Sequence, residues 1–196
     1  MSNWYKNYII ATTLRDLVNM PSNKYNEMSD VDKRNFQEIY QQPAYDIEDD
    51  TEQPGFVGSA IEDETIKGYL YGYEFIVEDN MEDFDIDNIV CYDEECKKDG
   101  YINYIKEKAN NKKILYVSNL AIDQEYRGNL LMLVSDFLKK VRSGGFEYMA
   151  FEALSDSYRL MFKNNTPREE LMKRFGLKII GRIPTGDSHS VLVKVL

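Results

Sequence analysis

The chain has 196 residues, 43% of them hydrophobic and 13% aromatic, which suffices for one sizeable core and favours a packed globular protein over a disordered one. Its 34 acidic residues outnumber its 24 basic ones, and the formal net charge of −10 argues against broad binding to nucleic acid or anionic lipid, which calls for a basic surface. No run of 18 apolar residues occurs, and the start, MSNWYKNYII, has no long apolar segment typical of a secretion signal. We therefore expect a cytoplasmic protein without a membrane span.

The two cysteines, Cys91 and Cys96, lie close together in CYDEEC. Two cysteines do not make a disulfide framework, and without a secretion signal they are predicted to be free thiols. The only histidine, His189, is far away in the sequence. No metal site is predicted.

The first part of the chain predicts one strand and helical segments. A strand is expected near Tyr8 to Ala11, followed by helical residues around Leu14 to Val18. The segment SDVDKRNFQEIYQ reads as a helix, which either Ser29 or Asp30 can cap.

Further along, an acidic segment precedes a hairpin. YDIEDDTEQPG ends in Pro-Gly and is predicted to be a loop. FVGSAIEDETIKGYLYGYEFIV then reads as two antiparallel strands joined by a polar turn near Glu62 to Glu64. Residues 78–113 are less regular and form a possible insertion, with an acidic, solvated run EDNMEDFDIDN and a short helix in YINYIKEKANN.

The clearest pattern is a strand followed by a helix. Ile114 to Ile122 is an apolar strand, and the helix beyond Gly128 ends at Gly144-Gly145, after basic residues that suit a helix C-terminus. Apolar residues at spacings of 3, 4, 7 and 8 predict one buried face of this helix. Its members are Leu130, Leu131, Leu133, Val134, Phe137, Leu138 and Val141.

The last third predicts a strand, a helix and a closing pair of strands. FEYMAFEAL is the strand, and NTPREELMKRF is the helix, with Thr166 as N-cap, Pro167 at the first position and Glu169 completing a capping box, before Gly176. LKIIGRI and HSVLVKVL close the chain around the turn PTGDS. Helices that alternate with strands and hairpins predict a single α/β domain over residues 1–196, with a mixed sheet.

The corner between the strand and the helix is a candidate binding site. Its sequence is Asp123-Gln124-Glu125-Tyr126-Arg127-Gly128. A helix leaves about four backbone N–H groups without partners at its start, and its dipole adds partial positive charge there. Such a corner can bind a phosphate where small residues let the backbone approach, and Gly128 and Asn129 meet that need. An ordinary strand-to-helix connection has the same local sequence, so the corner alone does not decide between the two.

From Phe56 onward the chain resembles the GCN5-related N-acetyltransferase (GNAT) family. LAIDQEYRGNLLM matches the family's cofactor motif at Leu120, Ala121, Ile122, Tyr126, Arg127 and Gly128. NTPREELMKRFGL resembles the family's last helix, which often starts at Asn, here Asn165, and ends in Gly-Phe, here Gly176-Leu177. IKGYLYGY resembles the family's third strand.

The resemblance implies a mixed, mostly antiparallel central sheet flanked by helices, with splayed central strands, and acetyl-coenzyme A as co-substrate. Its pantetheine arm would lie along Leu120, Ala121 and Ile122, where a backbone N–H would polarise the thioester carbonyl. Its pyrophosphate would lie on the backbone amides that precede and open the helix, with Asn165 also near the cofactor. These amides belong to Arg127, Gly128, Asn129, Leu130, Leu131 and Met132.

The sequence departs from the family pattern in three places. Leu130 and Met132 stand where the motif has Gly, and Gly or Ala. Met172 stands where the family often has a proton-donating Tyr, and Ser118 and Asn119 replace an acidic residue that is frequent on the cofactor strand.

Two other residues are therefore candidates for the acid–base work that amine acetylation requires. Tyr158 can supply the acid from a preceding turn, and Glu74 can help to deprotonate the acceptor. Packing or surface roles compete for both, and for His189.

The sequence predicts an N-acetyltransferase that moves an acetyl group to a primary amine, and the acidic composition favours a cationic acceptor such as a polyamine, an aminoglycoside or a lysine-rich protein. One alternative is a catalytically inactive GNAT-like module that binds coenzyme A or a protein. Another is an acidic interaction protein that mimics nucleic acid. A homodimer is possible, and the sequence does not decide the oligomeric state.

Overall fold

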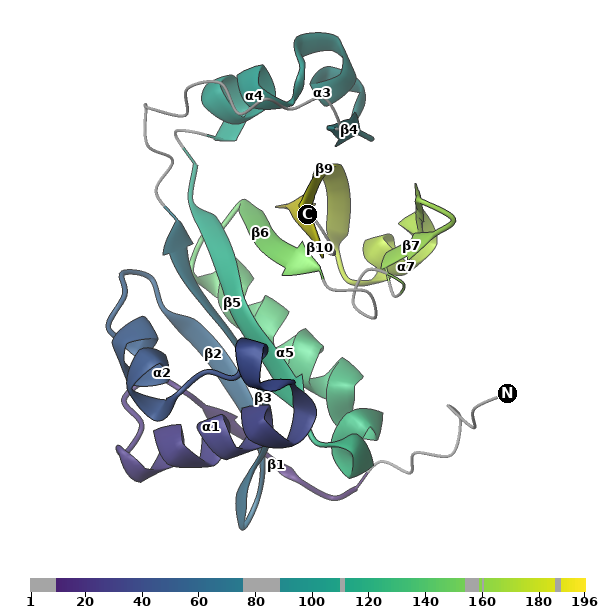
Figure 1. Cartoon of the computed structure of the whole chain (residues 1–196). Helices are drawn as coiled ribbons and strands as arrows, with labels where there is room; N and C mark the ends of the chain where they lie inside the picture. The colour runs from purple at the N-terminus through teal and green to yellow at the C-terminus, as the bar shows by residue number, and fades with distance from the viewer. Residues whose placement is uncertain (1–9, 76–88, 110–111, 154–158, 160, 186–187) are drawn as a thin grey trace. The chain divides into compact units, whose positions relative to one another are not determined.

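The computed structural model describes residues 10–75, 89–109, 112–153, 159, 161–185 and 188–196. They form two compact units (Figure 1): Met1–Tyr73 with Ser118–Gly144, and Glu74–Val117 with Gly145–Leu196. Strand β5 supplies residues to both. No described helix is long and apolar enough to cross a membrane.

The sheet is mixed and mostly antiparallel. Its strands follow the order β1-β2-β3-β5-β6-β10-β9-β4, and helices flank it. Among the six described strand pairs of this sheet, β5 with β6 is parallel and the other five are antiparallel. The bounds are β1 Thr13–Asp16, β2 Val57–Asp63, β3 Thr65–Phe75, β4 Val90–Cys91, β5 Ile114–Ile122, β6 Tyr148–Ala153, β9 Leu177–Thr185 and β10 Ser188–Val195. The predicted fold class is confirmed.

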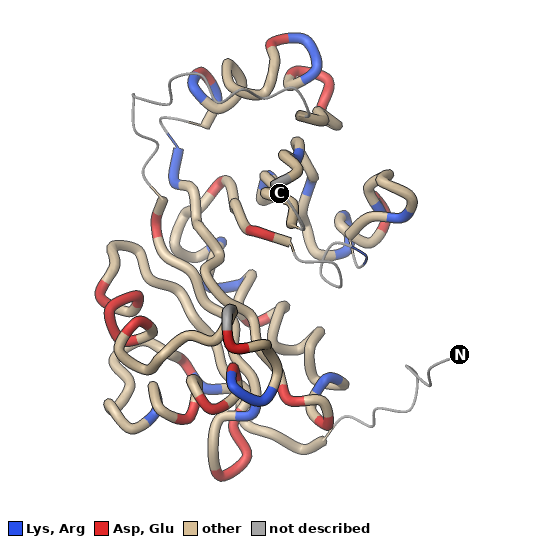
Figure 2. Tube along the Cα trace, in the orientation of Figure 1, with Lys and Arg blue, Asp and Glu red and all other residues tan. Residues whose placement is uncertain are grey.

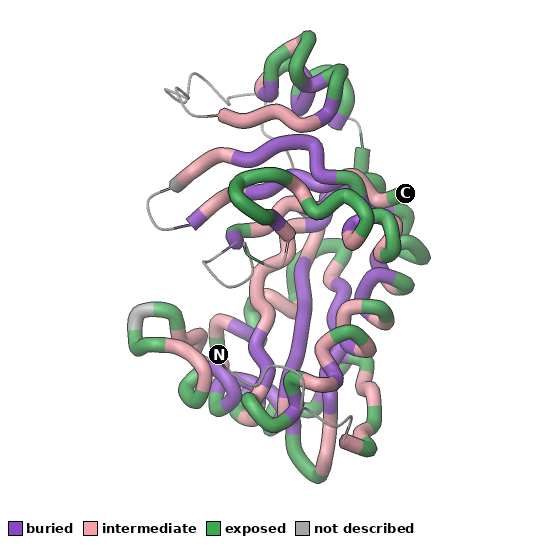
Figure 3. Tube along the Cα trace, turned by 90° about the vertical axis from the view of Figure 1, so that its right-hand side faces the viewer, coloured by how far each residue is buried: buried purple, intermediate pink, exposed green. Residues whose placement is uncertain are grey.

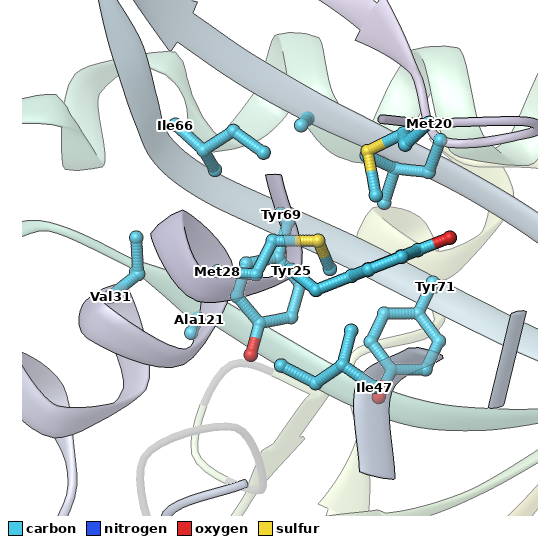
Figure 4. Close-up of a cluster of buried hydrophobic side chains, with 11 residues drawn as sticks. Met20, Tyr25, Met28, Val31, Ile47, Ile66, Tyr69, Tyr71 and Ala121 are labelled. Carbon is cyan, nitrogen blue, oxygen red and sulfur yellow. The ribbon is translucent and has the colours of Figure 1, made fainter. Parts of the chain in front are cut away.

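In the first unit, helices cover both faces of the strands (Figures 1 and 3). On one face lie α1 (Asn23–Asn35), the 3₁₀ turn η1 (Glu38–Tyr40) and α2 (Ala44–Thr51). On the other lies α5 (Leu130–Ser143), which is tied to β2 by a 2.8 Å hydrogen bond from Ser59 Oγ to Asp136 Oδ2. The layers enclose apolar side chains from both helices and three strands (Figure 4).

The start of the unit differs from the prediction. Residues around Leu14 form strand β1 instead of a helix, because they pair with β2 in the register Thr13 with Glu62, and Arg15 Nε donates to Glu62 Oε2 at 2.6 Å. Ile10 and Ala11 belong to no strand, and the rest of the strand predicted at Tyr8 to Ala11 lies outside the described residues.

The two helices on this face also correct the prediction. α1 begins at Asn23, six residues before Ser29, so that Ser29 and Asp30 lie inside the helix and cap nothing. The segment predicted to be an acidic loop forms α2. Its only fully buried residue is Ile47, so its sequence lacks the repeating apolar residues by which an amphipathic helix is recognised.

The hairpin and the central helix follow the prediction closely. β2 and β3 meet at Glu64, whose φ of 61° makes the turn, and β5 spans the predicted residues. α5 ends before Gly145, whose φ is 74°. Its buried residues are Leu133, Phe137, Leu138 and Val141. Leu131, predicted to be buried, is 63% exposed.

In the second unit, β6 pairs with β10 and β10 with β9, and helices follow β4 along the chain. They are α3 (Glu94–Asp99), α4 (Tyr101–Tyr104) and the π-helical turn η2 (Ile105–Ala109). α4 and η2 confirm the short helix predicted in YINYIKEKANN, whereas α3 precedes that segment and was not predicted. The acidic run predicted to be solvated, Glu78 to Asn88, lies outside the described residues.

Two predictions for this unit are wrong. Cys91 and Cys96 form a disulfide, with Cα atoms 5.6 Å apart, because Asp93 caps α3 and turns the chain back on itself. The predicted helix start is a small hairpin, β7 (Phe162–Lys163) with β8 (Thr166–Pro167), and α7 begins only at Glu169. Asn164 and Asn165 make its turn with φ of 52° and 62°, a conformation that Asn tolerates better than most residues.

Candidate functional site

The described pairing of strand β5 with β6 stops halfway along β5. Its first residues pair with β6 in a parallel register that ends at Val117 opposite Phe151. Among the described residues, this register gives no β6 partner to Ser118–Ile122, although these residues stay in the strand. In the described part of the chain, the second half of β5, all of it in the first unit, therefore has backbone groups that the ladder with β6 does not use.

This second half rests closely on β3. A Cβ atom added at Gly68 would lie 2.7 Å from Ile122 Cγ1, closer than real Cβ atoms pack, and 3.2 Å from Ala121 O, which is a tight contact. The Asp123 N–H donates to Lys67 O at 2.8 Å. Gly68 thus lets the end of β5 approach β3. The hydrogen bond from Asp123 to Lys67 fixes the position at which the corner after β5 begins.

The corner forms a 3₁₀ helix, η3 (Gln124–Asn129), that runs directly into α5. A 3₁₀ helix bonds each N–H to the carbonyl three residues before it. Accordingly the Tyr126 N–H donates to Asp123 O at 2.9 Å, and the Leu130 N–H donates to Arg127 O. The N–H groups of this corner, predicted to be free, are therefore largely used by the chain itself.

Side chains hold the corner from three sides. Asp123 accepts from Arg34 Nη2 at 2.8 Å and Nε at 3.0 Å. Tyr126 donates to Asp63 Oδ2 at 2.7 Å, and this hydrogen bond is the main reason why the pKa of Tyr126 is raised to about 12. Asn129 donates from Nδ2 to Thr12 Oγ1 at 2.9 Å. These contacts fix the direction in which α5 leaves β5.

A polar network under α1 was not predicted from the sequence. Asp32 is fully buried, and its Oδ1 accepts from Tyr69 Oη at 2.5 Å. Its Oδ2 accepts from Asn119 Nδ2 and from the Gln42 N–H, each at 3.0 Å. Both carboxylate oxygens are thus satisfied by donors on β3, on β5 and in the segment between α1 and α2.

A second carboxylate of this kind comes from α2. Asp50 Oδ2 accepts from Tyr71 Oη at 2.8 Å, from Ser118 Oγ at 3.0 Å and from Gln42 Nε2 at 3.4 Å. Tyr71 and Tyr69 are stacked neighbours on β3, with ring centroids 5.8 Å apart (Figure 4). Desolvation and the charge of Asp50 raise the pKa of Tyr71 far above its ordinary value, so this phenol is a hydrogen-bond donor at any physiological pH.

The two carboxylates mark an irregularity in β5. Successive side chains of a strand point to opposite faces. Ser118 and Asn119 are consecutive, yet both donate to carboxylates on the α1–α2 side. The alternation is therefore interrupted where the ladder with β6 ends.

The solved structures that resemble this chain include acetyltransferases. No protein-family model matches the chain, and no curated protein matches it in sequence. An aminoglycoside 6′-N-acetyltransferase in complex with coenzyme A is 13% identical, with a TM-score of 0.55 over 94% of this chain and 97% of that one. Ard1 from Thermoplasma volcanium is 12% identical, with a TM-score of 0.57 over 95% of this chain and 99% of that one. The NatC complex bound to a Gag peptide and coenzyme A is 10% identical, with a TM-score of 0.57 over 95% and 98%.

The chain has the GNAT fold. The predicted resemblance is thereby confirmed at the level of the fold, which is what likeness at such low identity supports. The acetyltransferases it resembles include proteins seen with coenzyme A.

Within the GNAT fold, the first unit collects most of the residues predicted to bind cofactor. Ala121 and Ile122 are buried and Leu120 is partly buried. Arg127 is exposed on the corner and Gly128 is partly exposed.

The predicted residues at the start of α5 differ from one another. Leu130 and Met132 are partly buried and Leu131 is exposed. Asn129 as a whole is 1% exposed, and its side chain is used by the chain, since its Nδ2 also donates to Ile10 O at 2.9 Å. Neither its side chain nor its backbone is exposed to a ligand.

The remaining predicted residues belong to the second unit or lie outside the described residues. Asn165 lies in the second unit, where its carbonyl accepts from Tyr92 Oη at 2.8 Å. Glu74 also belongs to the second unit, 4.0 Å from Lys113 Nζ. Tyr158 lies outside the described residues.

Charge is unevenly distributed in the first unit. Acidic residues gather on α2 and at the β2–β3 turn (Figure 2). Within the described part of the chain, no group of three or more His, Cys, Asp or Glu side chains is placed to hold a metal ion.

The tyrosines of β3 were the signal for the network that sequence analysis missed. Tyr69, Tyr71 and Tyr73 alternate along the strand, so that all three face one side. A buried phenol needs a hydrogen-bond partner, and a row of them predicts polar groups opposite.

Proposed function

We propose that the chain is an acetyl-coenzyme A-dependent N-acetyltransferase that acetylates a primary amine. The GNAT fold supports the general reaction, and the single observation that carries the proposal is the second half of β5. Among the described residues, its backbone has no β6 partner from Ser118 to Ile122, immediately before the corner that leads into α5. An unpaired strand edge can accept an extended, amide-containing chain such as pantetheine.

The residues of the strand fit acetyl-coenzyme A better than those of the corner. Leu120, Ala121 and Ile122 offer apolar contacts and backbone hydrogen bonds to the pantetheine arm. At the corner, exposed Arg127 can pair with a phosphate, and Gly128 lets it approach. The N–H of Leu130 is already bonded, so the phosphates would depend on the remaining amides and on the positive end of α5.

The reaction is a direct attack of the amine on the thioester. The amine nitrogen forms a bond to the carbonyl carbon, the C–S bond breaks, and a proton from the nitrogen ends on the released sulfur. A backbone N–H between Leu120 and Ile122 would polarise the carbonyl. Glu74 and Tyr158 remain candidates for the base and the acid.

A second candidate function is a GNAT-like module that binds coenzyme A without turnover. Met172 favours it, because it stands where the family often has a proton-donating Tyr, and its absence would impair turnover without preventing cofactor binding. The 3₁₀ helix at the corner, Leu130 and Met132 do not distinguish the two candidates, because both require the phosphates to bind.

The test is thermal unfolding with acetyl-coenzyme A, coenzyme A and ATP, followed by a thiol-release assay on a panel of amines. Stabilisation by the first two ligands alone, with thiol release, supports the acetyltransferase. Stabilisation without release supports the binding module, and no stabilisation contradicts both.

A matched pair of variants locates the site on α5. Gly128→Gln should abolish the stabilisation, because a long side chain at the corner blocks the phosphates. Gly144→Gln, at the exposed opposite end of α5, is the control, since its φ of −75° accepts any residue. Equal binding by both variants would exclude the corner as the phosphate site.

A further inference from the structure

The carboxylate of Asp50 is held by hydrogen bonds through one oxygen and has no described partner at the other. Its Oδ2 is held by three donors, Tyr71 Oη, Ser118 Oγ and Gln42 Nε2, at 2.8 to 3.4 Å. Across the described residues, neither a hydrogen bond nor an ion pair involves its Oδ1, and no Lys or Arg pairs with either oxygen. The side chain is partly exposed. The carboxylate is therefore fixed in direction but keeps one oxygen available to a ligand.

The surroundings of Asp50 suit a cation. Tyr71 and Tyr73 stand on the same face of β3, and Tyr71 Oη donates to Asp50 Oδ2 at 2.8 Å, which places this aromatic ring beside the carboxylate. An ammonium group is bound best by a carboxylate that offers a charge-assisted hydrogen bond next to aromatic rings. Glu48 and Asp49, on the same helix, are exposed, and neither accepts a hydrogen bond from a tyrosine of β3 among the described contacts.

The position of Asp50 connects it to the proposed chemistry. Its partner Ser118 is the first residue of the β5 segment that has no β6 partner. Leu120 follows two residues later, about 7 Å further along the strand. The open carboxylate thus stands beside the segment on which the thioester would lie.

We propose that Asp50 receives the ammonium group of the acceptor amine. This inference rests on the proposed acetyltransferase function and assigns its acceptor subsite to cationic primary amines. The ammonium donates to Oδ1 and passes its extra proton through Asp50 to water. The neutral amine then attacks the thioester carbonyl carbon, and its second departing proton ends on the sulfur of the released thiol.

The experiment compares Asp50→Asn with Asp49→Asn. The first change keeps the shape of the side chain and removes its charge; the second removes the same charge from the neighbouring exposed position of the same helix. Spermidine, kanamycin and a short lysine peptide are titrated calorimetrically into wild type and both variants, with and without coenzyme A.

We expect Asp50→Asn to weaken binding of at least one of these amines tenfold or more, and Asp49→Asn to change it less than twofold. Affinity for coenzyme A should stay the same in both variants. Ser118→Ala, which removes one bond that orients Asp50, should weaken amine binding by a smaller factor and serves as the test if Asp50→Asn does not fold.

Two outcomes overturn the assignment: equal amine affinity of Asp50→Asn and wild type, or no binding of any of the three amines to wild type. Neither bears on coenzyme A, whose binding and thiol release decide the proposed function separately. The titration without coenzyme A tests Asp50 even where the cofactor does not bind.

Discussion

The regions around Asp32 and Asp50 are built alike and differ in one respect. Each carboxylate comes from a helix over the sheet, accepts from a tyrosine of β3 and accepts from a polar side chain of β5. Asp32 is fully buried and both of its oxygens are bonded. Asp50 is partly exposed and bonded through one oxygen.

The difference separates a structural carboxylate from one that can serve a ligand. A buried acceptor shared by several donors stabilises the fold mainly because its removal leaves those donors without partners. A partly exposed carboxylate with a free oxygen adds little stability, since water can replace its contacts. Variants that distinguish stability from binding should therefore affect the two regions in opposite ways.

The largest expected effect is on stability at Asp32. Asp32→Ala leaves Tyr69 Oη, Asn119 Nδ2 and the Gln42 N–H without their acceptor, so we expect the free energy of unfolding to fall by about 3 kcal/mol. Urea unfolding measures it. Asp30→Ala, which removes an exposed carboxylate of the same helix, is the control and should cost less than about 0.5 kcal/mol. A loss at Asp32 as small as this would mean that water enters and satisfies the three donors.

The consecutive residues of β5 should divide in the same way. Asn119→Ala removes the amide that contacts Asp32, Gln42 Oε1 and Tyr69 Oη, and we expect a loss of about 2 kcal/mol. Ser118→Ala removes one hydrogen bond to partly exposed Asp50 and should cost about 0.5 kcal/mol. Equal losses, again measured by urea unfolding, would contradict the distinction between the two regions.

Sequence reasoning predicted the elements that local patterns determine. The sequence predicted the second hairpin strand, β5 and α5 correctly. The signals for these elements are alternation, helical periodicity and terminal glycines, and each signal lies within the segment itself. The same reasoning failed at β1, whose short polar sequence becomes a strand only by pairing with β2. It failed at α2 because a single buried Ile47 leaves no period.

The sequence named candidate residues on β5 and on the corner after it. It did not predict that the side chains of Asp32 and Asp50 contact β5. The residues of the corner follow one another in the sequence, so a motif could identify them. Asp32 and Asp50 meet Asn119 and Ser118 across 87 and 68 residues, and nothing local marks such pairs. At the positions where the family often has an acidic residue, Ser118 and Asn119 donate hydrogen bonds to the carboxylates of Asp50 and Asp32.

The smallest expected effect is a pH dependence that belongs to Asp32. Its pKa is raised, with burial as the largest cause and the hydrogen bonds from Tyr69, Gln42 and Asn119 acting against it. The native state therefore keeps the proton at pH values where the unfolded chain has released it. Since stability falls with pH wherever the native state binds more protons, the contribution of Asp32 is fully present below the ordinary aspartate pKa and is lost as the pH rises through the folded pKa.

Asp32→Asn isolates this contribution, because the other carboxylates titrate alike in both proteins. We expect the difference in unfolding free energy between wild type and Asp32→Asn to shrink as the pH is raised from about 4 toward 7. Urea unfolding at each pH measures the difference. A constant difference would mean that burial and hydrogen bonding cancel at Asp32. A difference that grows with pH would mean that the hydrogen bonds outweigh burial, in which case Asp32 stabilises the fold as an anion, as a salt-bridged carboxylate does.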